Sequence, residues 1–199
     1  VETDEASWTA VFGSGPNDHV KAMLDGVATT HLFDFQRYVV ELALASERFA
    51  AFLDCGLGKT LISLAWAHTV AKAGKVLLLC PLAVLKQFQR EAVRFHGAPL
   101  VNLRDGEPWS DGIGILNFEA RRAIDMNGVA GVILDEASIL KNADGETRDY
   151  LVNLVQGVRY RLAASATPAP NDQAEYSNQA VFLGYARTAK EFWSRFFRK

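Results

Sequence analysis

The sequence predicts a three-layer α/β domain, with helices on both faces of a mostly parallel central sheet. Short, continuous apolar runs have the length of buried strands, and amphipathic or helix-forming stretches separate them. Strands that alternate with helices imply right-handed crossovers, and therefore strands that run in parallel. The length of 199 residues is enough for one such domain with a full core.

The regular pattern begins at residue 32. Residues 1–31 have a mixed composition and are interpreted as a leader or accessory segment, and residues 32–199 as the folded lobe. The predicted elements are helices at 35–47, 61–74 and 81–97 and strands at 48–53, 75–80, 112–116, 131–135 and 159–167.

The composition is that of an ordinary globular protein, with 49% hydrophobic and 22% charged residues. The formal net charge of -2 excludes binding to nucleic acid through overall charge, so any such contact must be local. No apolar run approaches the roughly 20 residues of a membrane span, and we expect no membrane partner.

Two further features bear on where the protein works. Cys55 and Cys80 fit a reducing compartment, so we expect a cytoplasmic protein of a prokaryote or phage-infected cell, or a nuclear one in a eukaryote. Since the chain begins at Val1, we expect a processed chain or an excised fragment.

The first chemical signal is a glycine loop between the predicted strand at 48–53 and the helix that follows. Gly56 and Gly58 allow the backbone to approach phosphate oxygens, and the start of a helix favours an anion. Lys59 can reach the β- and γ-phosphates of a nucleotide, and the Thr60 hydroxyl can bind Mg²⁺. The usual pattern begins with a glycine where this chain has Leu53, and the alternative is a glycine-rich turn with a surface lysine.

An acidic pair follows the predicted strand at 131–135. Nucleotide hydrolysis needs one carboxylate to support Mg²⁺ and a second to activate water, and Asp135 and Glu136 can divide these roles. The alternative is a solvated helix start, but the glycine loop earlier in the same α/β pattern favours the functional interpretation.

A third segment carries Ser165 and Thr167 at the end of the last predicted strand, just before Pro168. Small hydroxyl residues beside the acidic strand can sense the γ-phosphate. Taken alone, the segment is more simply a strand end followed by a proline-rich turn.

Together these segments resemble the first RecA-like lobe of superfamily 2 helicases, and most closely the Swi/Snf-type DNA translocases and their phage relatives. The similar segments occur in the family's order and are LFDFQ, DCGLGKT, CPLAVLKQFQREAVRF, ILNFEA, LDEASILKN, RLAASATPAPND and EFWSRFF. The combination of the acidic segment LDEASILKN with the segment RLAASATPAPND is specific for the family, whereas the Gly-Lys-Thr sequence alone is not.

The resemblance implies a RecA-like P-loop fold and a set of residues that bind ATP with Mg²⁺. Gln36 is expected to read adenine, and Asp135, Glu136 and Lys59 to be catalytic. Ser165 and Thr167 are expected to couple the nucleotide to DNA, and Thr60 and Asp135 to support Mg²⁺, largely through water. The residues expected to bind the nucleotide are Gln36, Gly56, Leu57, Gly58, Lys59, Thr60 and Leu61.

The chain also departs from the family. Ser138 stands where the family has a histidine or aspartate, so the link between the acidic segment and Thr167 is expected to differ. A second RecA-like lobe, which carries the arginine fingers in the family, is expected as a partner in the complete protein. Arg187, Arg195 and Arg198 lie too close to the end of the first lobe to be assigned that role.

DNA contacts are expected through the phosphate backbone of a duplex, without base reading. The residues expected to make them are Lys86 and Gln87, near the start of the helix after Pro81, and Asn117, at a strand end. An ordinary solvated lysine is the alternative for Lys86. The basic and aromatic residues 187–199 are expected to form an amphipathic helix that packs Phe192, Trp193, Phe196 and Phe197 inward.

The expected function is that of an ATP-hydrolysing motor lobe, which drives translocation along double-stranded DNA together with its second lobe. Two alternatives stay open at this point. One is the motor lobe of a restriction-type translocase or an RNA helicase, and the other is a non-catalytic nucleotide-binding module. The presence of both acidic residues favours catalysis.

Overall fold

The computed structural model describes residues 18–120, 123–142, 145–167 and 176–196. Its helices are α2 (Asp18–Leu24), α3 (Asp34–Ser46), α4 (Lys59–Val70), α5 (Leu82–His96), α6 (Ile139–Asn142), α7 (Gly145–Leu154), α8 (Tyr176–Leu183) and α9 (Ala189–Phe196). Its strands are β1 (Arg48–Phe52), β2 (Lys75–Cys80), β3 (Val101–Asn102), β4 (Ile113–Asn117), β5 (Val129–Asp135) and β6 (Tyr160–Ser165). Two short 3₁₀ helices, η1 (Leu103–Asp105) and η2 (Phe118–Ala120), follow β3 and β4.

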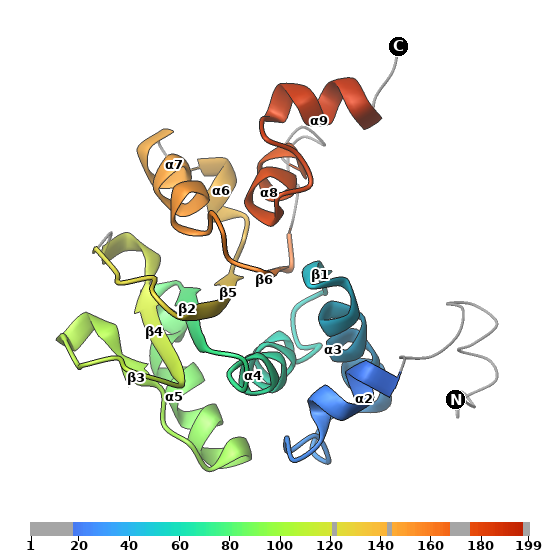
Figure 1. Cartoon of the computed structure of the whole chain (residues 1–199), viewed down its shortest axis with the longest axis vertical. Helices are drawn as coiled ribbons and strands as arrows, with labels where there is room; N and C mark the ends of the chain where they lie inside the picture. Colours follow the sequence, from blue (N-terminus) through green and yellow to red (C-terminus); the bar gives the residue numbers. More distant parts are fainter. Residues whose placement is uncertain (1–17, 121–122, 143–144, 168–175, 197–199) are drawn as a thin grey trace.

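The six strands form one sheet in the order β1-β6-β5-β2-β4-β3, and every neighbouring pair is parallel. Figure 1 shows α2 to α5 on one face of this sheet and α6 to α8 on the other. The prediction of a three-layer α/β domain with a mostly parallel sheet is therefore confirmed. Because all strands point the same way, the segments that follow β1, β5 and β6 meet at one edge of the sheet.

The alternation of side chains along β2 explains why its run of apolar residues is uninterrupted. Val76, Leu78 and Cys80 lie in the core between the sheet and α2 to α5, whereas Leu77 and Leu79 lie in the core beneath α6 to α8. All of these side chains are fully buried, as expected for a strand that is covered on both faces.

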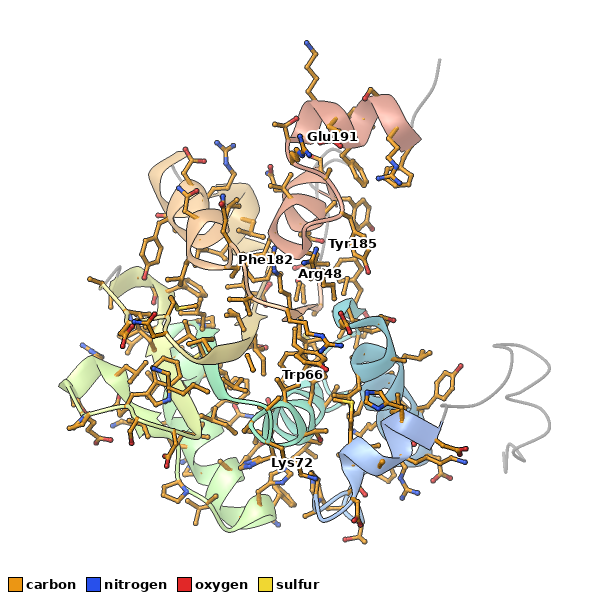
Figure 2. All side chains as sticks on the ribbon, viewed as in Figure 1. Arg48, Trp66, Lys72, Phe182, Tyr185 and Glu191 are labelled. Atoms are coloured by element: carbon orange, nitrogen blue, oxygen red, sulfur yellow. The ribbon has the colours of Figure 1, made fainter. Side chains whose placement is uncertain are left out.

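A glycine within β5 allows α4 to pack closely on the sheet. A Cβ atom at Gly131 would lie 2.8 Å from a methyl carbon of Val70 and 3.2 Å from the Trp66 ring. The Trp66 side chain is fully buried in this space, and it lies beneath the sheet in Figure 2. A larger residue at position 131 would push α4 away from the sheet.

The N-terminal helix α2 packs on the lobe. Val20 is buried in the same core as α3 and α4, and Lys72 Nζ donates hydrogen bonds to the backbone oxygens of Met23 and Asp25. Residues 18–31 thus form part of the packed body. The domain boundary at residue 31 stays a prediction, and residues 1–17 lie outside the described part of the chain.

Helix α8 is attached to the sheet through two arginines from neighbouring strands. Arg161 Nη1 donates a hydrogen bond of 2.8 Å to the Phe182 backbone oxygen, and the Tyr185 hydroxyl donates one to the Arg48 backbone oxygen. Figure 2 shows Arg48, Phe182 and Tyr185 close together at this end of the molecule. Burial lowers the pKa of Arg161 to about 10, and the nearby charge of Arg48 adds to this effect.

The prediction for the C-terminal helix is wrong in part. Residues 189–196 do form the amphipathic helix α9, but none of its residues is buried and the Phe196 side chain is 56% exposed. The helix follows α8, packs against it and extends away from the sheet (Figure 1), and its Phe192 and Trp193 side chains are half-buried. Phe197 lies outside the described residues.

Candidate functional site

The glycine loop leads from β1 to the start of α4, as the sequence predicts. Gly56 and Gly58 have φ angles of +83° and +78°, which favour glycine over residues with a side chain. A Cβ atom at Gly58 would lie 2.2 Å from the Gln36 Nε2 atom, so the position also lacks space for a side chain. Thr60 lies in the first turn of α4, beside the free backbone N–H groups that favour an anion.

Lys59 folds back over this loop. Its Nζ atom donates hydrogen bonds of 2.8 Å to the Leu53 backbone oxygen and 3.1 Å to the Asp54 backbone oxygen. The ammonium group is therefore held against the glycine loop, where a phosphate would meet a positive charge. Both hydrogen-bond partners of the ammonium group are neutral carbonyls, and its positive charge also lowers the pKa of the nearby Asp135 carboxyl.

Gln36 connects α3 to the glycine loop and is only 3% exposed. Its Oε1 atom accepts a hydrogen bond of 3.0 Å from the Phe33 backbone, and its Nε2 atom donates one of 3.0 Å to the Leu57 backbone oxygen. The structure thus places Gln36 at the loop, while adenine reading by this amide stays a prediction. Leu57 is 39% exposed at the loop, and Leu61 is partly buried against the core.

The acidic pair lies at the same edge of the sheet. Asp135 ends β5, and its Cα atom is paired in register with that of Ala164 on β6. Burial raises the pKa of Asp135 to about 6, and the charge of Glu136 raises it further whereas Lys59 lowers it. Glu136 has a φ angle of +60°, which is uncommon for a residue with a long side chain.

Ser165 joins the three segments that the sequence singles out. It is fully buried, and its backbone oxygen accepts a hydrogen bond of 3.1 Å from the Leu53 N–H at the start of the glycine loop. Its hydroxyl donates to Glu136 Oε1 at 3.1 Å and accepts from the Thr167 N–H at 3.1 Å. Thr167 itself is exposed, and Pro168 lies outside the described residues.

A second hydroxyl reaches the same carboxylate. Ser138 Oγ donates a short hydrogen bond to Glu136 Oε1, the atom that Ser165 also contacts. The sequence indicates that Ser138 departs from the family pattern, but it does not predict this contact. A serine two residues after a glutamate carries no signal by itself.

The residues expected to contact DNA are not equally accessible. Lys86 and Gln87 are exposed on α5, and Gln87 Nε2 donates a hydrogen bond of 2.8 Å to Glu91 within the helix. Asn117 is only 6% exposed, and its Nδ2 atom donates to Glu119 at 2.9 Å. A phosphate contact by Asn117 stays a prediction.

The described residues fit Mg²⁺ with a nucleotide. Asp135 and Glu136 lie next to each other at the end of β5, and burial of Asp135, with a smaller contribution from the charge of Glu136, raises the pKa of Asp135. A bound divalent cation would favour the charged form of this carboxyl. Among the described residues, no group of three His, Cys, Asp or Glu side chains could hold a metal ion alone. This agrees with Mg²⁺, which is usually held by one or two protein ligands together with phosphates and water.

The opposite edge of the sheet contains a cluster that sequence spacing does not reveal. His68 and His96 stack with their ring centroids 4.2 Å apart, and His31 meets His96 edge-on at 5.2 Å. The Nε2 atoms of all three are buried and have no hydrogen-bond partner among the described residues. Burial lowers the pKa of each of these histidines. The pKa of His96 falls to about 4, because the charges of His68 and His31 add to the effect of burial.

No protein-family model matches the sequence, and no curated protein sequence matches it significantly. Solved structures do match in fold. A SWI2/SNF2 ATPase core from Sulfolobus solfataricus in complex with dsDNA has a TM-score of 0.70 and 22% identity, over 85% of this chain and 40% of that chain. The UvsW helicase from bacteriophage T4 has a TM-score of 0.64 and 14% identity, over 92% of this chain and 66% of that chain.

A third match is the Pyrococcus furiosus Hef helicase domain, with a TM-score of 0.61 and 17% identity over 75% of this chain and 36% of that chain. This chain therefore spans between 36% and 66% of the lengths of these proteins. No helix in the described part of the chain is long and apolar enough to cross a bilayer. The chain has a RecA-like α/β fold, which it shares with parts of these ATPase and helicase structures.

Proposed function

We propose that this chain is the ATP-binding lobe of a DNA-dependent ATPase that moves along duplex DNA, and that it hydrolyses ATP together with a second RecA-like lobe. One observation carries the proposal: Ser165 joins the glycine loop to the acidic pair at one edge of the sheet. A loop that fits phosphates and a carboxylate that fits a general base are thereby held together.

Each residue at this edge has a role that follows from its chemistry. The backbone N–H groups around Gly56 and Gly58, together with Lys59, bind the phosphates. Thr60 and Asp135 support Mg²⁺, which neutralises phosphate charge when it is bound. Glu136 accepts a proton from the attacking water.

Two observations support the proposal that the protein binds DNA. One of the matched structures is described as a complex with dsDNA. In this chain, Lys86 is exposed on α5, whose N-terminus directly follows β2 at the same edge of the sheet as the acidic pair. A helix N-terminus with a nearby lysine fits a phosphate of the DNA backbone, and it reads no base.

ATP turnover of the full-length native protein, with and without duplex DNA, tests the proposal. We expect turnover to rise when duplex DNA of any sequence is added, and to rise less with single strands. The present chain alone should turn over ATP very slowly, because an arginine finger from a second lobe is worth about 10³–10⁵ in rate in comparable sites. Fast hydrolysis by this chain, with no response to DNA, would contradict the proposal.

A further inference from the structure

Ser138 lies in a short turn that is fixed on both sides. The Ala137 N–H donates a hydrogen bond of 2.8 Å to the Ala164 backbone oxygen on β6, and the Ile139 N–H donates one of 3.0 Å to the Glu136 backbone oxygen. The backbone of this turn is therefore tied to the neighbouring strand and to itself. The Ser138 hydroxyl is consequently held within hydrogen-bond reach of Glu136.

Two hydroxyls converge on one oxygen of Glu136. Ser138 donates to Oε1 from within the acidic segment, and Ser165 donates to the same atom from β6 at 3.1 Å. A serine hydroxyl carries one hydrogen, and the Ser165 oxygen already accepts from the Thr167 N–H. The Ser165 hydrogen is thus directed to Glu136, and no described residue donates a hydrogen bond to Oε2.

We infer that Ser138 is a positioning residue for Glu136: together with Ser165 it fixes Oε1 and leaves Oε2 as the oxygen that accepts the proton from water. A glutamate side chain has several rotatable bonds, and a base acts only when it lies within hydrogen-bond reach of its proton. Fixing one oxygen removes most of this freedom. The inference rests on the proposed function, in which Glu136 is the general base.

The arrangement predicts how the rate of hydrolysis and the nucleotide affinity change when each hydroxyl is removed. Either serine alone still holds Oε1, so removing one hydroxyl weakens the positioning and removing both abolishes it. Neither hydroxyl touches the glycine loop through its side chain, so the chemical step should suffer while nucleotide binding does not. A purely structural role would instead lower stability, and with it every activity in proportion.

The test measures nucleotide affinity and the single-turnover rate of ATP hydrolysis, in the full-length native protein with saturating duplex DNA. We expect Ser138→Ala to lower the rate on the order of tenfold, the value of one hydrogen bond to a charged group, at unchanged affinity. Ser138→Thr keeps the hydroxyl and should restore the rate. The double variant Ser138→Ala with Ser165→Ala should lose more than the product of the two single losses.

Ser194→Ala is the matched control, because Ser194 is exposed on α9 and its hydroxyl contacts only the Glu191 backbone oxygen among the described residues. A Ser138→Ala variant with the wild-type rate, or Ser138→Thr without recovery, would overturn the inference and leave the proposed function intact. So would equal losses of affinity and rate. A wild-type protein that binds no nucleotide would instead refute the proposed function.

Discussion

Helices α4 and α5 pack against each other, and their two ends show opposite solutions to the placing of polar groups. At their N-terminal ends, Lys59 and the neighbouring Gln36 and Glu136 all have hydrogen-bond partners. At their C-terminal ends, His68 and His96 are packed as rings whose Nε2 atoms have no partner in the described structure. The side chains of Lys59, Gln36 and Glu136 are thus hydrogen-bonded at one edge of the sheet, whereas the ring Nε2 atoms of His68 and His96 are buried without a described partner at the other.

Titratable groups at the two edges also change the stability of the fold with pH in opposite directions. The folded state raises the pKa of Asp135 from 3.8 to about 6, so this carboxyl favours folding at low pH and loses that contribution as pH rises through this range. The folded state lowers the pKa of His96 from 6.5 to about 4, so this ring favours folding at high pH. The dipole at a helix C-terminus should raise the pKa of His96, and burial therefore outweighs it.

The largest effect is expected at the acidic pair. Glu136→Gln keeps the size of the side chain but cannot accept a proton from water, so hydrolysis should fall by about 10²–10⁴-fold. Nucleotide binding should stay nearly unchanged, because the glycine loop and Lys59 are intact. Single-turnover hydrolysis and nucleotide titration of the full-length protein measure both quantities, and an equal loss of binding and hydrolysis would show that the roles are wrongly assigned.

The next effect concerns the charge at the start of α4. Lys59→Ala removes the ammonium group from the glycine loop, and nucleotide affinity should fall by about 10–100-fold, the value of a hydrogen bond to a charged group. Titration with a fluorescent ATP analogue measures this loss. Lys86→Ala is the matched control at the start of α5 and should leave nucleotide affinity unchanged. If Lys59→Ala and Lys86→Ala lowered nucleotide affinity equally, the assignment of nucleotide binding to Lys59 alone would be wrong.

Much of this site could be predicted from the sequence, because its parts lie in segments with local patterns. Apolar runs predict β2, β4, β5 and β6, and the glycine loop and acidic pair come directly after strands. The link that Ser165 makes between them follows from a parallel sheet in which β6 lies between β1 and β5. The sequence does not state that order.

The opposite edge could not be predicted in the same way. His31, His68 and His96 are far apart along the chain, and two of them occupy ordinary last-turn positions of helices. Only the packing of α5 beside α4, and of the segment before α3 against both, brings their rings together. The exposed face of α9 was mispredicted for a related reason, since amphipathicity shows that a helix has an apolar face but not what covers it.

A smaller effect is expected when the histidine cluster is tested through the pH dependence of folding stability. Lowering the pH from 7.5 to 5 should decrease the free energy of unfolding by about 1–2 kcal/mol through His96, allowing for solvent around a partly exposed ring. The loss begins near the unfolded pKa of 6.5 and ends near the folded pKa of about 4. Because Asp135 gains stability over the same pH range, the difference between the wild type and His96→Phe measures the contribution of His96, in urea unfolding at a series of pH values.

His96→Phe keeps a ring in the stack and removes its titrating nitrogens, so it should flatten the fall in stability below pH 6.5. His19→Gln is the matched control, because His19 is exposed on α2 outside the cluster. Equal pH dependence in the wild type and His96→Phe would show that the cluster does not control stability in acid.

The smallest effect is expected at the start of α5. Each phosphate that a lysine neutralises adds about 0.9 to the slope of log affinity against log salt concentration, so Lys86→Ala should lower the slope for duplex DNA by about one unit. The change should be the same for unrelated duplex sequences. Lys21→Ala, an exposed lysine on α2, serves as the control. An unchanged slope, or a strong sequence preference, would place the DNA contact elsewhere.

The backbone at Glu136 has a consequence for anyone who redesigns this lobe. A φ of +60° is a conformation that glycine adopts at no steric cost and that a glutamate adopts at a cost of about 1–3 kcal/mol. Replacing Glu136 with glycine would remove this cost, but it would also remove the proposed base and the acceptor of the Ser138 and Ser165 hydroxyls. Thermostabilised versions of this lobe should keep position 136 fixed and take their gains from exposed positions away from the proposed nucleotide and DNA sites.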